Sequence, residues 1–131
     1  DTEIEMVTGV IMVSGTYDAD ISRAAENRIA YFGDDFSRWP EISTIGNVSS
    51  VETPVMFTVS EFDSNISPIG TAALINEYAE KAGQLPRIVQ LMKHNHYSPN
   101  PSIGTQDTQL SAAILQFVSS VLGEQQLLTA R

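Results

Sequence analysis

Three short apolar runs mark the chain at residues 10–13, 54–60 and 86–92. The first two are rich in β-branched side chains and show no polar alternation, which is typical of strands buried on both faces of a parallel sheet. The third run carries polar residues, so we expect it nearer an edge of the sheet. Each run contributes one methionine that we expect in the core. These are Met12, Met56 and Met92.

Apolar residues recur at helical spacing between and after these runs, over residues 21–31, residues 69–82 and the segment that begins after Asp107. Each segment has a candidate N-cap before it and a glycine stop after it. The caps are Asp20, Ser67 and Asp107, and the stops are Gly33, Gly83 and Gly123. Residues 34–53 are expected to be irregular. Alternating strands and helices predict an α/β fold with parallel strands covered by helices on both faces.

Composition narrows the classes of function. The 131 residues fit one α/β unit, 1–131, and 42% of them are hydrophobic, enough for a core. A net charge of −9 argues against binding nucleic acid or an anionic membrane. The absence of cysteine excludes thiolate metal sites and cysteine nucleophiles. No run is long enough for a membrane span, and no basic region precedes an apolar core, which favours the cytoplasm without fixing the localisation.

A carboxylate and an imidazole come directly after consecutive predicted strands. Asp63 comes after the second strand, and His96 after the third. In an open parallel sheet, ligands and catalytic groups collect beyond the carboxyl ends of the strands. A carboxylate that accepts a hydrogen bond from an imidazole fixes its tautomer and stabilises the imidazolium formed when the ring takes a proton. We therefore expect Asp63 and His96 to pair.

The motif order adds a resemblance. The run PVMFTVSEFD, a helix, the run RIVQLMKHNHYS and a last helix resemble the C-terminal part of α/β-hydrolase esterases and lipases, the carboxylesterase and kynurenine-formamidase-like group. GVIMVSGTYD resembles the strand before the acid strand, and residues 19–53 resemble the substrate-side excursion. The resemblance implies that Asp63 is the triad acid and His96 the triad base, because His96-Tyr97-Ser98 reproduces the family's His, aromatic, Ser order.

The chain departs from that family at the nucleophile. It contains no G-x-S-x-G elbow and no HGGG-type segment for an oxyanion hole, and Ser14-Gly15 lacks the glycine two residues before the serine. We therefore expect the chain to be about half of a larger domain, as a fragment, a cleaved product or a subunit. The serine would come from an N-terminal part. No cofactor or metal is implied.

Other interpretations of the same residues stay open. Asp18 and Glu61 are weaker candidates for the acid, and Asp63 could serve turn chemistry alone. His94 competes with His96 for the role of base. Both histidines could be loop residues without a role, or could offer two nitrogens to a metal, although a catalytic zinc site needs about three protein ligands.

The predicted function is hydrolysis of a small carboxylic ester by a serine hydrolase of which this chain supplies the acid and base. The alternative is a non-catalytic interaction module on a truncated hydrolase scaffold, covered by a partner or by self-association. Four aromatic residues are candidates for contacts with substrate, and packing of the excursion onto the sheet is the competing interpretation. These are Tyr17, Tyr31, Trp39 and Tyr97.

Overall fold

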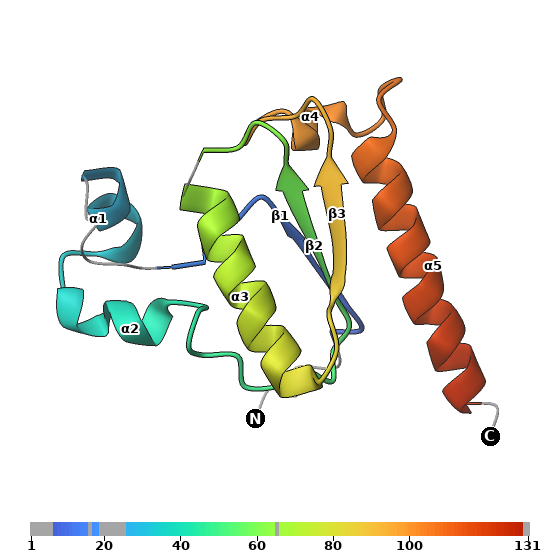
Figure 1. Cartoon of the computed structure of the whole chain (residues 1–131), viewed down its shortest axis with the longest axis horizontal. Coiled ribbons are helices and arrows are strands. Elements are labelled where there is room, and N and C mark those ends of the chain that lie inside the picture. The colour runs from blue at the N-terminus through green and yellow to red at the C-terminus, as the bar shows by residue number, and fades with distance from the viewer. Residues whose placement is uncertain (1–6, 16, 19–25, 65, 130–131) are drawn as a thin grey trace.

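The computed structural model describes residues 7–15, 17–18, 26–64 and 66–129, which form a parallel sheet between two helical layers (Figure 1). The strands are β1 (Val10–Val13), β2 (Val55–Ser60) and β3 (Arg87–Leu91), in the spatial order β1-β2-β3. All pairs are parallel, with Val10 opposite Val55 and Met56 opposite Arg87. The predicted α/β class and the three strand positions are confirmed, and β3 is an edge strand of this sheet.

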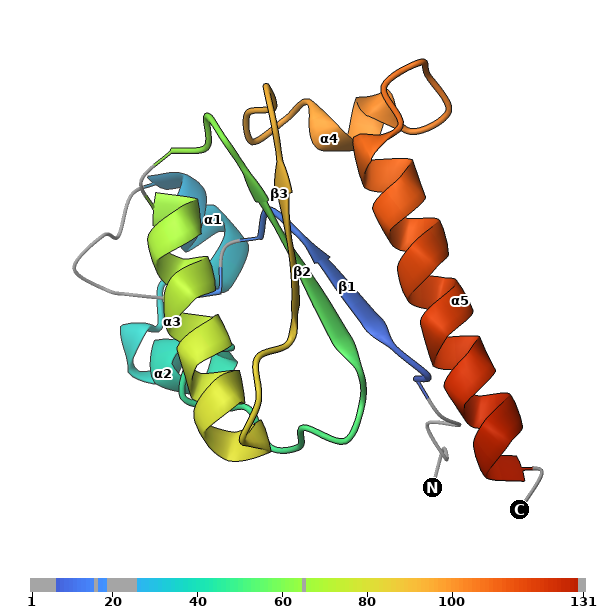
Figure 2. The same ribbon diagram turned by 45° about the vertical axis from the view of Figure 1, so that its right-hand side comes forward.

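The long helices lie on opposite faces of the sheet, α3 (Ile66–Ala82) on one and α5 (Gln109–Thr129) on the other (Figure 2). The short helices α1 (Glu26–Phe32) and α2 (Trp39–Ile42) lie on the α3 side. A 3-10 turn, η2, and the short helix α4 complete the described elements. They span Phe36–Arg38 and Pro99–Ser102.

The predicted helix ends are partly confirmed. Gly33 directly succeeds α1 with φ +84°, and its N–H bonds to Ile29 O; Gly83 succeeds α3 in the same way with φ +70°. The predicted stop at Gly123 is wrong, because α5 continues to Thr129. An interior glycine costs a helix only about 1 kcal/mol relative to alanine, and good helix formers come after it. The predicted cap Asp20 and residues 21–25 lie outside the described residues.

Strand β2 separates two hydrophobic clusters, because successive side chains of a strand point to opposite faces. Met56 packs with Phe117 and Val121 of α5, whereas Phe57 packs with Tyr17 and with Leu74 of α3. Met12 packs, partly buried, against the second cluster. The expectation that Met92 belongs to the core is wrong: β3 ends one residue earlier, and 47% of the Met92 surface is exposed.

The loops after β2 and β3 are joined at the carboxyl edge of the sheet. The N–H of Glu61 donates to Leu91 O at 3.0 Å, and that of Phe62 donates to His94 O at 2.8 Å. These bonds bring the segment that carries Asp63 next to the segment that carries both histidines. Among the described residues, no helix is long and apolar enough to cross a membrane.

Candidate active site

The structure brings Asp63 and His96 together at the carboxyl edge of the sheet. Oδ1 of Asp63 lies 3.1 Å from Nδ1 of His96. The carboxylate is enclosed, with 1% of its side chain exposed, whereas 37% of the His96 side chain is exposed. A buried acceptor therefore holds a ring whose other edge faces outward. The predicted pairing of these two side chains is present, and their catalytic role remains a prediction.

This contact fixes how His96 carries its proton. An ionised carboxylate can only accept hydrogen bonds, so Nδ1 of the neutral ring carries the hydrogen and Nε2 has a free lone pair. No hydrogen bond to Nε2 is found among the described residues. In this tautomer, Nε2 of the neutral ring is the nitrogen that could act as a general base.

Asp63 also takes part in the turn after β2. Its N–H donates to Ser60 O at 3.2 Å, and its Oδ1 accepts from the N–H of Ser64 at 3.0 Å. Turn chemistry and the contact with His96 thus coexist in one side chain. The second oxygen, Oδ2, is buried and has no hydrogen-bond partner within the described part of the chain. That orphaned acceptor leaves the carboxylate's negative charge incompletely compensated beneath His96.

Tyr17 lies in the core below this pair. Its ring meets Phe57 edge-on, with centroids 6.3 Å apart, and its hydroxyl accepts from the N–H of Gly15 at 3.1 Å. Burial raises the pKa of the Tyr17 hydroxyl above its usual value, and the charge of Asp63 raises it further. Tyr17 is therefore a buried neutral phenol within the electrostatic reach of Asp63.

The four aromatic candidates for substrate contacts separate in space. Tyr97 is 81% exposed and its ring stands edge-on to that of His96, with centroids 5.1 Å apart. Tyr31 is also exposed, on α1. Trp39 is enclosed, because its ring packs against Phe36 with centroids 5.1 Å apart and none of its surface is accessible. Packing of the excursion is thus the better interpretation of Trp39, and Tyr97 is the candidate that lies beside His96.

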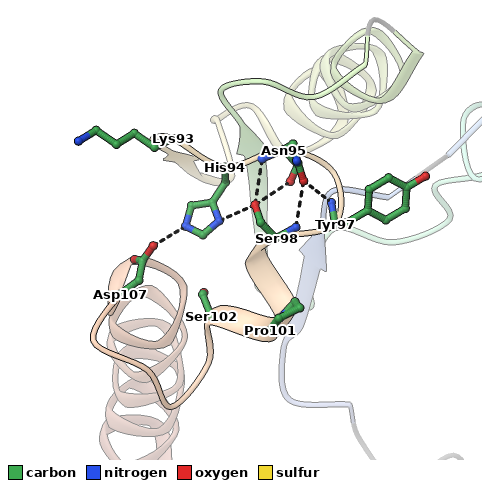
Figure 3. Close-up of a pocket in the computed structure, with 8 residues that line it drawn as sticks. All are labelled: Lys93, His94, Asn95, Tyr97, Ser98, Pro101, Ser102 and Asp107. Atoms are coloured by element: carbon green, nitrogen blue, oxygen red, sulfur yellow. Dashed lines mark hydrogen bonds and ion pairs between the residues drawn. The ribbon is translucent and has the colours of Figure 1, made fainter.

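His94 has partners of its own (Figure 3). Its ring is buried, Nδ1 lies 2.9 Å from Oγ of Ser98, and Nε2 lies 2.9 Å from Oδ2 of Asp107. The interpretation of His94 as a surface loop residue is therefore wrong. Its contact with Asp107 was not expected, because the sequence indicated Asp107 only as a cap. Asp107 does accept from the N–H of Gln109 at 3.2 Å, as a cap would.

Two of the weaker candidates, Glu61 and Ser14, have structural partners. Oε2 of Glu61 accepts from the N–H of Lys93 at 2.6 Å, which ties the two strand-end loops together. Ser14 is buried at φ +45°, and its hydroxyl lies 3.1 Å from that of Ser60. Asp18 is partly buried beside Tyr17 in the sequence. Within the described residues, no three His, Asp or Glu side chains gather in a way that could hold a metal ion.

An open hollow of about 580 Å³ lies on the His94 side of this loop. It is bordered by Lys93, Tyr97 and Asp107, but neither Asp63 nor His96 lines it. Comparison of the sequence with models of known protein families finds no match, and comparison with curated proteins finds none either.

Proposed function

We propose that this chain supplies the acid and base of a carboxylic ester hydrolase of the α/β-hydrolase kind. Asp63 is the acid, His96 is the base, and the serine nucleophile comes from a segment outside these 131 residues. The observation that supports this most directly is the 3.1 Å contact between a buried carboxylate and Nδ1 of a half-exposed imidazole at the carboxyl edge of a parallel sheet.

The chemistry divides between the two side chains. Nε2 of His96 takes the proton of the serine hydroxyl as the serine oxygen attacks the ester carbonyl. The same nitrogen then returns the proton to the departing alcohol, which leaves an acyl-serine. Water, activated by His96 in the same way, cleaves the acyl group as a carboxylic acid. Asp63 keeps Nδ1 protonated throughout and stabilises the imidazolium.

The nucleophile is the part that the proposal places elsewhere. None of the serines in these 131 residues lies in a G-x-S-x-G pentapeptide. An acid and a base alone do not form an acyl-enzyme, since that route needs the serine and donors for the oxyanion. We therefore expect the 131-residue chain by itself to be inactive toward esters.

The test compares this chain with a polypeptide that joins it to its proposed nucleophile segment, using a short-chain aryl ester. We expect turnover only from the longer polypeptide. His96→Ala and Asp63→Asn should lower kcat/KM by about 10⁴–10⁶-fold, the range seen when members of such triads are removed. Asp18→Asn is the matched control and should leave turnover unchanged. Turnover by the longer polypeptide that survives His96→Ala would refute the proposal.

A second candidate function is an interaction module. It is favoured by exposed apolar side chains at helical spacing on α5, which the described part of the chain leaves uncovered. These are Leu115, Val118 and Leu122. The ester assay separates the two candidates, because a module without catalytic function gives no turnover in either polypeptide.

A further inference from the structure

The turn that carries His96 closes on itself. The N–H of Asn95 donates to Oγ of Ser98 at 3.0 Å, while Oδ1 of Asn95 accepts from the N–H groups of Tyr97 and Ser98, at 2.9 and 3.1 Å. His96 lies between these reciprocal bonds. The turn is therefore a small rigid unit, and the direction of the His96 ring depends on how the whole unit is fastened to the rest of the molecule.

His94 supplies that fastening toward α5. Its buried ring connects Ser98 of the turn to Asp107, just before α5, through the two 2.9 Å contacts (Figure 3). Its carbonyl accepts from the N–H of Phe62 on the β2 side. One residue thus joins the turn, the segment after β2 and the segment that leads into α5. None of these contacts involves a reacting atom.

The donor and the acceptor in the contacts from Asp107 through His94 to Ser98 can be assigned by starting at Asp107. The N–H of Gln109, with smaller contributions from its side-chain amide and from His94, holds the pKa of Asp107 below its usual range, so this carboxylate is ionised. A carboxylate only accepts, which places the hydrogen of neutral His94 on Nε2. Nδ1 at 2.9 Å then accepts from the hydroxyl of Ser98, in preference to Asn95 O, which lies further from that hydroxyl at 3.5 Å. The carboxylate oxygen lies out of line with the Nε2–H bond, so this contact is chiefly electrostatic.

We propose that His94 is the positioning residue for His96, holding the turn Asn95–Ser98 against α5 so that Nδ1 of His96 meets Oδ1 of Asp63. The proposal depends on the proposed function, because the direction of the His96 ring matters to the reaction only if His96 is the base. It assigns opposite tautomers to the two rings, with hydrogen on Nε2 of His94 and on Nδ1 of His96.

Ser98, His94 and Asp107 together have the composition of a serine triad, but their arrangement does not suit Ser98 as a nucleophile. The hydroxyl of Ser98 already accepts from the N–H of Asn95 while it donates to His94. The His94 ring is buried, with Nδ1 hydrogen-bonded to Ser98 and Nε2 facing the carboxylate of Asp107, so neither nitrogen is oriented by a contact toward a substrate. A positioning role is compatible with the contacts of His94 to Ser98 and Asp107 and of Ser98 to Asn95, because it requires no change in any of them.

The test uses ring ¹⁵N NMR of the 131-residue chain, which has only two histidines. We expect the two opposite tautomers in the unaltered chain. Asp107→Asn keeps an acceptor for Gln109 but turns an amide donor toward His94, so His94 should switch to the Nδ1–H tautomer while His96 stays unchanged. His94 with hydrogen on Nδ1 in the unaltered chain would overturn the assignment.

The positioning role itself is tested by His94→Asn and by Asp107→Ala, two variants that release the turn from opposite sides. We expect the His96 ring to become a mixture of tautomers and its Nδ1–H to exchange with solvent about tenfold faster. Asp35→Ala is the matched control. Like Asp107, Asp35 accepts a hydrogen bond from the backbone N–H two residues further on, but it does so at the start of η2, away from this loop. It should leave both rings unchanged.

If His96 keeps its single tautomer and slow exchange in either released variant that folds, the positioning role is refuted. Asp107→Ala alters a 40% exposed side chain and is the safer of the two for folding. These readouts need no ester turnover. An inactive longer polypeptide with the predicted tautomers would refute the proposed function alone, and unresponsive tautomers with full activity would refute the positioning role alone.

Discussion

At the scale of single residues, Gly15 shows how closely the core approaches the end of β1. A Cβ atom placed on Gly15 would lie 2.5 Å from Cε1 and 2.6 Å from Cζ of Tyr17. The Tyr17 ring is buried against Phe57, so it cannot easily retreat. Glycine is required here because another part of the chain occupies the space that a side chain would need.

We predict that Gly15→Ala lowers the free energy of unfolding by about 1–3 kcal/mol, the usual cost of overpacking a core. Gly70→Ala is the matched control, because Gly70 lies within α3 and no atom lies within 4 Å of its added Cβ. That substitution should stabilise the chain by about 0.5–1 kcal/mol. Urea unfolding measures the free energy of unfolding of both variants. Equal effects of the two substitutions would contradict the close approach of Tyr17.

The candidate site divides into residues that could and could not be predicted from the sequence. Asp63 and His96 could be, because each comes just after a strand and parallel strands end at the same edge. The contact of His94 with Asp107 could not, since Asp107 lies beyond α4, just before α5. Likewise the enclosure of Trp39 depends on how the excursion folds back on itself, with Phe36 against the indole ring.

At the scale of elements, α3 holds the excursion through one carboxylate. Oε2 of Glu77 accepts from the N–H of Gly46 at 2.6 Å, and Oε1 accepts from that of Val48 at 3.2 Å. Lys81 bonds to both Oε1 of Glu77 and Val48 O. Lys81, and then the N–H of Gly46, lower the pKa of Glu77 below its usual value. The carboxylate form of Glu77 is thus what fastens the loop to the helix.

Because the pKa of Glu77 is lower in the folded chain, its stabilising contribution is complete above the ordinary carboxyl pKa of 4.5 and is lost as the pH falls through the lowered value. We predict that the amide protection factors of Gly46 and Val48 decrease over that acidic range. Glu77→Gln should reduce them about tenfold at neutral pH, because hydrogen bonds to a charged acceptor are lost. Hydrogen exchange, corrected for intrinsic rates, measures this.

The control for Glu77 lies on the same helix. Glu80 accepts only from the side-chain amide of Asn76 among its described contacts, so Glu80→Gln should leave the protection of Gly46 and Val48 as it was. If both substitutions loosen the loop equally, the effect comes from the charge of α3 in general. The specific role of Glu77 would then be rejected.

The strands were easier to predict from sequence than the ends of the helices. Buried runs such as Val55–Ser60 are short and bounded by polar residues, so their positions can be inferred from composition. The end of α5 could not be inferred from Gly123, because a glycine ends a helix only when it adopts a left-handed conformation, as Gly83 does. Whether a glycine adopts that conformation depends on the residues after it and on the packing around it.

At the scale of the whole molecule, two features oppose each other. The net charge of −9 makes copies of the chain repel one another at low ionic strength. Along α5, Leu115 and Leu122 expose 67% and 49% of their surfaces, with the exposed Val118 between them. Apolar side chains arranged in this way favour contact with another surface. Ionic strength decides which feature dominates, because salt screens only the repulsion between charges.

We predict that the 131-residue chain associates with itself more strongly as salt is raised, the reverse of a contact held by ion pairs. Leu115→Gln combined with Leu122→Gln should abolish the association without changing the net charge. The melting temperature of the monomer should not change, because both side chains are exposed in the folded chain. Ser119→Gln, an exposed polar position on the same helix, should leave association intact. Sedimentation equilibrium across a salt series measures the association of the unaltered chain, the doubly substituted chain and the Ser119→Gln chain. Association that persists in the doubly substituted chain would move the contact from α5 to the outer edge of β1, where the described residues form no further strand pair.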